Sequence, residues 1–164
     1  EIGRLINLER LDLRNNALSE LPPEIGNLTE LAFLFLEVNG LTGLPMDIGR
    51  LAKLESLNLK QNRLTELPLE IGNLGNLRDL DLRDNVLTTL TSEIGRLINL
   101  EYLYLSGNQL QELPPEIGNL INLTALDLGD NQIMGLPPEI GEINRLIYLY
   151  LDGNPLSTLS TGIS

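Results

Sequence analysis

A string of the form L-x-x-L-x-L-x-x-N-x-L recurs along this chain at a fixed spacing of 23 residues. It begins at Leu8, Leu31, Leu54, Leu77, Leu100, Leu123 and Leu146. Its only internal change is Ile133, which replaces leucine at the eleventh position of the sixth copy. A fixed period of about 20–50 residues indicates a solenoid, in which each unit buries its apolar face against its neighbours. We therefore predict a single domain over residues 1–164 made of seven repeats, here numbered 1–7, with positions 1–23 counted from these leucines.

The alternation inside the string predicts a short strand with one buried face. Side chains of successive strand residues point to opposite faces, so the leucines at positions 4 and 6 share one face and positions 3 and 5 share the other. One repeat is too small to bury its own leucines, which must therefore pack against those of the next repeat. The residues at positions 3 and 5 are expected on the exposed face of the sheet.

The second half of each unit recurs as well, in the form L-P-x-E-I-G-x-L. It is seen in 113-LPPEIGNL-120 and, less perfectly, in 44-LPMDIGRL-51. Together with the first string it resembles the leucine-rich repeat family over essentially the whole chain. The 23-residue unit is similar to the type found in intracellular Ras-group proteins, Scribble-like scaffolds, Roco proteins and many bacterial proteins. The resemblance implies an α/β solenoid, an arc with a parallel β-sheet on its concave face, whose usual function is to bind other proteins.

Proline at the start of this second half predicts short helical or 3₁₀ turns on the convex face, and no long helices. An acidic residue follows in each turn, either as a cation-binding stripe or, as we expect, as solvated carboxylates near the N-terminal ends of the turns. These residues are Glu24, Asp47, Glu70, Glu93, Glu116 and Glu139. Repeat 4 lacks the proline and has Thr91 and Ser92 instead.

Asparagine occupies position 9 of every repeat. An amide in a bend can donate and accept hydrogen bonds at once, which suits backbone groups that have no partner in the sheet. We therefore predict a buried, structural asparagine ladder and not a row of ligand contacts. Its members are Asn16, Asn39, Asn62, Asn85, Asn108, Asn131 and Asn154.

Charge and composition exclude several classes of function. The formal net charge of −12 should repel nucleic acids and anionic membrane surfaces, so neither is expected as a partner. Without cysteine or histidine, the chain has no disulfide, no Cys/His zinc site and no Ser-His-Asp relay. Carboxylate pairs such as Asp79 with Asp81 lie on an open face where nothing would separate their pKa values. We expect no enzymatic activity, no cofactor and no metal, and we predict a cytoplasmic protein.

All six aromatic residues of the chain lie at positions 3 and 5 of a repeat. They are Phe33 and Phe35 in repeat 2, Tyr102 and Tyr104 in repeat 5, and Tyr148 and Tyr150 in repeat 7. The preference of aromatic residues for strands explains part of this placement. Because the three aromatic repeats are never adjacent, direct stacking between neighbouring strands does not explain the rest. Exposed rings on a concave sheet have the composition of interface anchors.

The tyrosines of repeats 5 and 7 predict a partner-binding site. At a strand spacing of about 4.8 Å they should stand roughly 10 Å apart, flanking Ala125 and Asp127. We call this arrangement the tyrosine slot. Its rim carries Asp130 and Asp152, so an arginine or lysine of a partner protein could stack on a ring and meet a carboxylate. Phe33, Phe35 and Val38 form a second candidate anchor among mixed charges.

Three functions stay open at this point. The first is a protein-interaction module, and the second is a recognition or regulatory domain of a larger enzyme, such as a Roco-type GTPase, a kinase or a ligase. The third is a structural spacer or engineered scaffold. The chain begins and ends within a repeat and shows no terminal cap. We therefore expect a fragment, or an array that self-associates end to end through the edge strands at 8–13 and 146–151.

Overall fold

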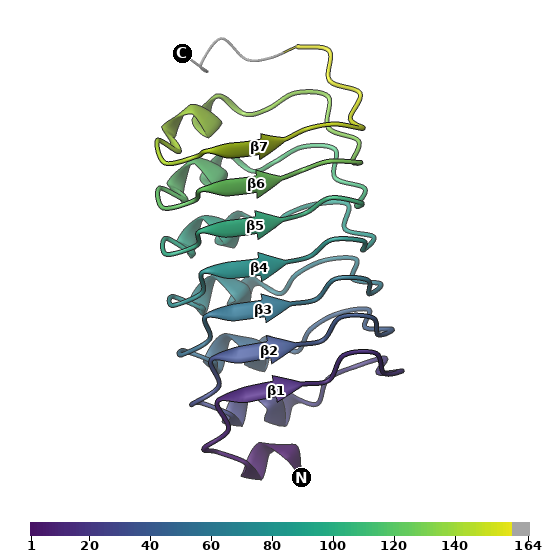
Figure 1. The fold of residues 1–164 in the computed structure, drawn as a ribbon, viewed down its shortest axis with the longest axis vertical. Coiled ribbons are helices and arrows are strands. Elements are labelled where there is room, and N and C mark those ends of the chain that lie inside the picture. Colours follow the sequence, from purple (N-terminus) through teal and green to yellow (C-terminus); the bar gives the residue numbers. More distant parts are fainter. Residues whose placement is uncertain (159–164) are drawn as a thin grey trace.

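The computed structural model describes residues 1–158, which form a coil of seven stacked turns with one strand in each (Figure 1). The strands pair in parallel and in chain order in a single seven-stranded sheet. They are β1 (Arg10–Asp12), β2 (Phe33–Phe35), β3 (Ser56–Asn58), β4 (Asp79–Asp81), β5 (Tyr102–Tyr104), β6 (Ala125–Asp127) and β7 (Tyr148–Tyr150). Each strand therefore covers positions 3–5 of its repeat, as the alternation predicts.

Short 3₁₀ turns lie behind the sheet and stack on one another along the array (Figure 1). They are η1 (Ile2–Arg4), η2 (Pro23–Asn27), η3 (Met46–Arg50), η4 (Leu69–Asn73), η5 (Ser92–Arg96), η6 (Pro115–Asn119) and η7 (Pro138–Glu142). In repeat 4 the Thr91 hydroxyl accepts a hydrogen bond from the Glu93 N–H at 3.3 Å, so threonine caps η5 where the other repeats use proline. The predicted solenoid with a parallel sheet and short turns is confirmed.

The core is one continuous stack of leucine and isoleucine between the sheet and the turns. The strand register places Leu34, Leu57, Leu80, Leu103 and Leu126 side by side, and each has no exposed surface. The inward assignment of positions 4 and 6 is therefore confirmed. Each leucine is covered by its counterparts in the adjacent repeats, which is why a single repeat could not fold alone.

The glycine of the E-I-G segment sits where successive turns touch. A Cβ atom on Gly72 would lie 2.7 Å from the backbone oxygen of Glu93 in the next turn, and one on Gly95 would lie 2.5 Å from that of Glu116. No real Cβ approaches an oxygen so closely. Glycine is thus required because the carbonyl of the next acidic residue packs directly on it, a constraint that the sequence pattern alone did not indicate.

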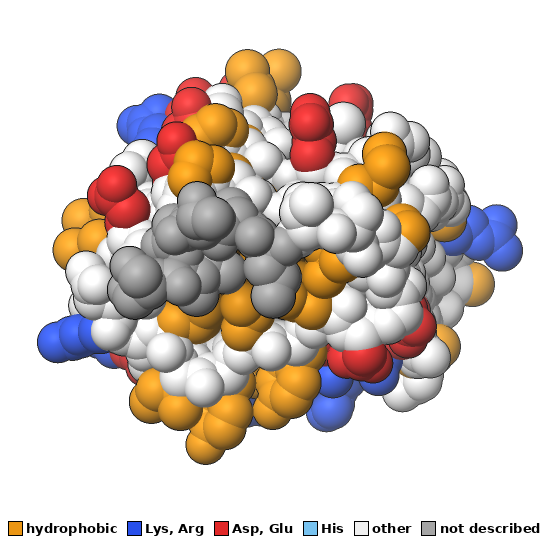
Figure 2. Space-filling view, turned by 90° about the horizontal axis from the view of Figure 1, so that it is seen from above, with side chains coloured by type: hydrophobic (Ala, Val, Ile, Leu, Met, Phe, Trp, Pro, Cys, Tyr) orange, Lys and Arg blue, Asp and Glu red, His pale blue; other side chains and the backbone are white. Residues whose placement is uncertain are grey.

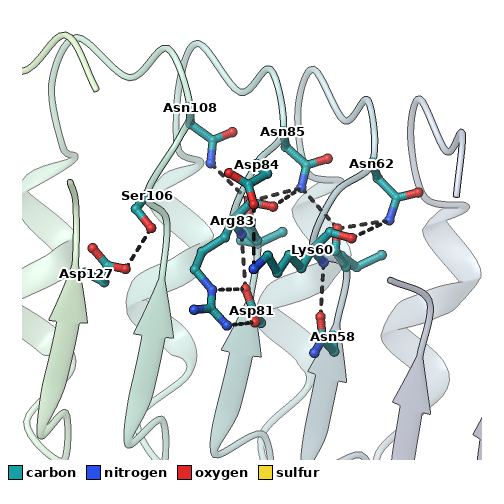
Figure 3. Close-up of polar contacts among 12 residues, drawn as sticks. Asn58, Lys60, Asn62, Asp81, Arg83, Asp84, Asn85, Ser106, Asn108 and Asp127 are labelled. Carbon is teal, nitrogen blue, oxygen red and sulfur yellow. Dashed lines mark hydrogen bonds and ion pairs between the residues drawn. The ribbon is translucent and has the colours of Figure 1, made fainter. Parts of the chain in front are cut away.

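The predicted asparagine ladder is present (Figure 3). The Asn62 amide donates to the carbonyls of Leu36 and Leu59 at 2.9 Å each, and its oxygen accepts from the Leu41 N–H at 3.1 Å. The same three bonds recur at Asn85. Two of them, to the Leu59 carbonyl and from the Leu64 N–H, join the repeat to the one before it. The asparagines of repeats 3–6 are buried, and those of repeats 2 and 7 are half-buried.

Asn16 departs from the predicted ladder, because it is exposed. Its amide donates only to carbonyls of its own repeat, those of Leu13 and Arg14. No preceding repeat covers it within the described chain, so the prediction of burial is wrong at this position.

A second asparagine row, which none of the sequence predictions includes, crosses the turns that lead into the strands. Asn76, Asn99 and Asn122 occupy position 23, and each amide donates to a carbonyl of the preceding repeat at 2.7–2.8 Å. Their spacing of 23 residues was the available signal. This row ties repeats 2–5 together on the side of the sheet where the strands begin.

Figure 2 looks onto the C-terminal end of the array, where apolar side chains are visible beside the residues that are not described. Leu146, Leu149 and Leu151 of repeat 7 are half-buried, unlike the fully buried leucines of the middle repeats. Within residues 1–158 no helix has the length and apolarity needed to cross a membrane. End-to-end association stays a prediction.

Candidate functional site on the concave sheet

All six aromatic side chains lie on the concave face of the sheet, as predicted. Phe33, Tyr102, Tyr148 and Tyr150 are exposed, while Phe35 and Tyr104 are half-buried. In each tyrosine pair the two rings stack within one strand, with centroids 6.4 Å apart and planes 10° apart in repeat 5 and 2° apart in repeat 7. Each pair therefore forms one flat aromatic wall that runs along its strand.

The strand register assembles the tyrosine slot that the sequence predicts. Tyr102 pairs with Ala125, which pairs with Tyr148, and Tyr104 pairs with Asp127, which pairs with Tyr150. Ala125 is buried between the two walls, and Asp127 is half-buried. Asp130 and Asp152 are exposed on the rim. The arrangement is as predicted, and its role in binding a partner stays a prediction.

The phenylalanine anchor of repeat 2 is partly covered, because two arginines of the chain itself lie over Phe35. The Cζ atoms of Arg10 and Arg14 lie 4.5 and 5.5 Å from the Phe35 ring centroid. Val38 is 42% exposed and adopts φ 56°, a left-handed conformation that is strained for a β-branched residue. Only Phe33 and Val38 of this predicted anchor are freely exposed.

Arg83 makes the same kind of contact in repeats 4 and 5. Its guanidinium holds Asp81 in a two-point ion pair, with Nε 2.9 Å from Oδ1 and Nη2 2.5 Å from Oδ2 (Figure 3). The Arg83 Cζ atom also lies 4.9 Å from the Tyr104 ring centroid. Asp81 raises the pKa of Arg83 by this hydrogen bonding. Arg14 binds Asp12 with the same two-point geometry, at 2.8 and 2.5 Å.

These contacts define a recurring unit that we call the carboxylate–ring frame. It consists of an aspartate at position 5, the residue at position 7 of the same repeat, and the aromatic ring at position 5 of the next. Repeats 1 and 2 supply Asp12, Arg14 and Phe35, and repeats 4 and 5 supply Asp81, Arg83 and Tyr104. In both frames an internal guanidinium lies between carboxylate and ring.

Repeats 6 and 7 contain a third frame, in which position 7 is glycine. Asp127 and Tyr150 are paired in register, but the intervening residue is Gly129. Asp127 accepts hydrogen bonds from the Gly129 N–H at 3.1 Å and from the Ser106 hydroxyl at 2.7 Å (Figure 3). A depression of about 260 Å³ opens there, lined by Ser106, Asp127, Gly129, Asp130, Tyr150 and Asp152. It lies at the rim of the tyrosine slot.

A second depression, of about 370 Å³, lies nearer the middle of the concave face, and none of the sequence predictions includes it. Phe33 and Phe35 bound it on one side and Tyr102 on the other, with Ser56 and Asp79 between them. Burial, and secondarily the charge of Asp81, raises the pKa of Asp79. The charge of Arg83, which is paired with Asp81, opposes this rise in the pKa of Asp79 only in part.

The acidic row on the convex face is partly paired within its own turns. Arg50 lies 3.2 Å from Asp47, and Arg96 lies 3.1 Å from Glu93. Across the part of the chain that the structure describes, no group of three or more acidic side chains is arranged to hold a metal ion. Two of the six carboxylates thus have a cation of their own turn as partner, and the choice between solvated carboxylates and a cation-binding stripe stays a prediction.

Comparisons with known proteins agree with this architecture. Models of leucine-rich repeats match residues 90–163, described as a leucine-rich repeat region, and residues 52–110 and 7–28, each described as a leucine-rich repeat. A comparison with curated protein sequences found no significant relative.

Several solved structures superpose on the chain. An internalin C2 of Listeria monocytogenes is 30% identical with a TM-score of 0.86, over 99% of this chain and 70% of that one. The plant peptide hormone receptor RGFR1 in complex with RGF2 is 35% identical with a TM-score of 0.85, over 96% and 26%. A leucine-rich repeat protein of Leptospira interrogans is 36% identical with a TM-score of 0.52, over 99% and 53%.

The chain thus spans about half or less of the length of the first structures that it matches, at 53%, 28% and 26%. The matched proteins include bacterial internalins and plant receptors, so the likeness to the Ras-group type stays a prediction. The repeat models and the matched structures agree with a leucine-rich repeat solenoid that has a parallel sheet and an asparagine ladder. The chain belongs to the leucine-rich repeat family, whose domains typically act as protein- or peptide-binding modules.

Proposed function

We propose that this chain is a protein-interaction module that binds a segment of a partner protein across its concave sheet, with the tyrosine slot as the main contact. The observation that carries the proposal is the placement of every aromatic side chain on this face, with two stacked tyrosine walls in register around Ala125 and Asp127. Tyrosines supply large contact areas at low entropic cost, and buried aromatic anchors dominate many interfaces.

Two similar structures support a peptide-like ligand. One is the receptor RGFR1 in complex with RGF2, and the other is the ectodomain of the Arabidopsis thaliana receptor kinase GASSHO1/SCHENGEN3 in complex with CASPARIAN STRIP INTEGRITY FACTOR 2. The acidic rim of the slot favours a partner segment that carries positive charge, because the potentials of the two surfaces are then complementary. Salt should weaken such binding by screening the exposed carboxylates.

A displayed library of random peptides tests the proposal and does not require the natural partner to be identified first. Peptides selected on the wild-type chain are measured against a variant with Tyr102, Tyr104, Tyr148 and Tyr150 changed to Ser. We expect a loss of binding of at least about tenfold, because the anchors of the interface are removed. Circular dichroism must first show that both proteins are folded.

The chain offers a matched control on its outer surface. Met46, Leu69, Ile98 and Ile121 are 52–67% exposed and lie outside the concave sheet. Their replacement by Ser removes four exposed apolar side chains while the tyrosine slot is kept, so the selected peptides should still bind. Equal loss in both variants, or no loss in the tyrosine variant, would refute a concave-face module.

A second candidate is the recognition or regulatory domain of a larger enzyme whose chemistry lies outside this chain. The similarity to the ectodomain of a receptor kinase favours it, since that repeat array is one part of a longer protein. It is compatible with the first candidate, because the concave face would still be the recognition surface. Sequencing the full reading frame decides this point, and a reading frame without a catalytic domain would exclude it.

A further inference from the structure

The third carboxylate–ring frame differs from the other two in a single side chain. In repeats 1 and 4 the residue at position 7 is an arginine, which binds the aspartate of its own repeat and lies over the ring of the next. In repeat 6 that position is Gly129, while the carboxylate of Asp127 and the ring of Tyr150 are both present in register. The third frame therefore has both partners for a guanidinium and no guanidinium of its own.

The backbone of the third frame is already arranged as in the other two. The Gly129 N–H donates to Asp127 Oδ1 at 3.1 Å, as the Arg83 N–H donates to Asp81 Oδ1 at 3.1 Å and the Arg14 N–H to Asp12 Oδ1 at 3.3 Å. Asp127 is thus held in the orientation in which its two counterparts bind arginine. Its Oδ2 accepts one further bond, from the Ser106 hydroxyl, and a carboxylate oxygen has room for another donor.

The space that an arginine would need is open. The depression of about 260 Å³ lies between Asp127 and Tyr150, where the position-7 side chain lies in the other two frames. A Cβ on Gly129 would stand 3.4 Å from Asp127 Oδ1 and 3.4 Å from Asp152 Oδ1, which is ordinary contact. The carboxylates of Asp130 and Asp152 add negative charge at the rim of this depression.

We propose that the frame of Asp127, Gly129 and Tyr150 is an arginine-recognition subsite, which takes a guanidinium supplied by the partner in the place that Arg14 and Arg83 occupy in the other frames. The proposal rests on the concave-face binding function and makes it more specific. Arginine is preferred over lysine because a planar guanidinium binds a carboxylate at two points and stacks on a ring, whereas an ammonium is a point charge.

The test uses N-acetyl-arginine amide as the probe and the backbone amide signals of the wild-type chain in NMR spectra. We expect saturable shifts centred on Gly129 and Tyr150, with a dissociation constant in roughly the millimolar range. N-acetyl-lysine amide should bind several-fold more weakly. N-acetyl-citrulline amide, which has nearly the same shape without the charge, should cause no saturable shift there.

Substitution at Gly129 provides the decisive comparison. Gly129→Arg supplies the missing side chain from within, so the probe should lose its site while the fold is kept. Gly129→Ala adds only a Cβ in ordinary contact, so it should bind the probe as the wild type does. If Gly129→Arg does not fold, Asp127→Asn removes the charge at nearly constant shape and should abolish the shifts instead.

The outcomes separate this proposal from the proposed function. Absence of shifts at Gly129 and Tyr150, equal binding of the citrulline compound, or unchanged binding to folded Gly129→Arg would each overturn the arginine subsite. If the peptides selected on the tyrosine slot still bind in that case, the module stands with a different anchor. Saturable probe binding with no peptide selected would overturn the proposed function and leave the subsite.

Discussion

Repeats 4–5 and repeats 6–7 carry the same carboxylate–ring frame and differ in how it is filled. In the first, Arg83 pairs with Asp81 and lies over Tyr104, so that Asp81 is only 4% exposed. In the second, Gly129 leaves Asp127 half-buried and Tyr150 50% exposed beside a depression. One position in the repeat thus decides whether this part of the concave face is satisfied internally or is open to a ligand.

The residues that maintain the fold and the residues that form the binding surface therefore occupy different positions of the repeat. Positions 4, 6 and 9 are leucine, leucine and asparagine in all seven repeats, and they serve the core and, except at Asn16, the ladder. Positions 3, 5 and 7 point to the concave face, where they can change without disturbing the stack. Arg14 lies over Phe35 in repeats 1–2, and Arg83 lies over Tyr104 in repeats 4–5. Repeats 6–7 leave Asp127 and Tyr150 without such an arginine.

The largest effect should be the same in both regions, because they share one core. Leu80→Ala in repeat 4 and Leu126→Ala in repeat 6 each remove a side chain without exposed surface, and each should lower the free energy of unfolding by about 2–5 kcal/mol. Urea denaturation monitored by circular dichroism measures both. A much smaller cost at Leu126 would mean that the two regions differ in packing and not only in surface chemistry.

The ladder should also stabilise both regions. Asn85→Ala and Asn131→Ala each leave buried backbone groups without a partner, at a cost of about 1–3 kcal/mol. Asn16→Ala is the matched control, because this exposed residue bonds only within its own repeat. Equal losses at Asn16 and Asn85 would contradict the view that the bonds between repeats are the stabilising ones.

Removal of the internal arginine should lower the free energy of unfolding by different amounts in the two filled frames. Arg83→Ala leaves the buried Asp81 carboxylate without its partner and should cost about 1–3 kcal/mol. Arg14→Ala should cost less, because both members of its ion pair are well exposed to water and screened by it. Thermal unfolding at low salt compares the two variants, and a larger loss for Arg14→Ala would show that burial does not set the strength of these pairs.

The smallest effect concerns Asp79, between the two phenylalanines and Tyr102. Since burial raises its pKa in the folded state, the folded chain binds this proton more tightly than the unfolded chain does. The contribution of Asp79 to the free energy of unfolding therefore falls as the pH rises from its pKa in the unfolded chain through its raised pKa in the folded chain. At neutral pH the full destabilisation by the buried carboxylate is present. Asp79→Asn should stabilise the chain at pH 7, with a gain that shrinks as the pH is lowered toward the unfolded pKa. If the gain in the free energy of unfolding does not depend on pH, the gain comes from packing and not from the charge of Asp79.

The period of 23 residues was sufficient to predict the solenoid, the inward leucines, the short turns and the ladder. Each of these depends on a residue type that recurs in one position, and the backbone of every repeat is the same. The tyrosine slot could be predicted for the same reason, since parallel strands in register bring Tyr104, Asp127 and Tyr150 side by side.

The paths of long side chains could not be predicted in this way. Arg10 and Arg14 cover Phe35 because their flexible stems reach across to the next strand, and nothing in the repeat pattern specifies that rotamer. Packing distances between turns could not be predicted from the sequence either. The close approach of the Glu93 backbone oxygen to Gly72, which requires glycine there, is visible only in the structure. The exposed Asn16 shows that asparagine at position 9 is buried only where a preceding repeat covers it.

In the proposed subsite, an aspartate, a ring in register and the lack of an arginine at position 7 together make a guanidinium site. The most direct test is the Arg83→Gly variant, which should convert repeats 4–5 into a copy of repeats 6–7. In an NMR titration of the folded variant with N-acetyl-arginine amide, we predict new saturable shifts at Asp81 and Tyr104 in addition to those at Gly129 and Tyr150. Shifts confined to repeats 6–7, or absent from both regions, would contradict the account.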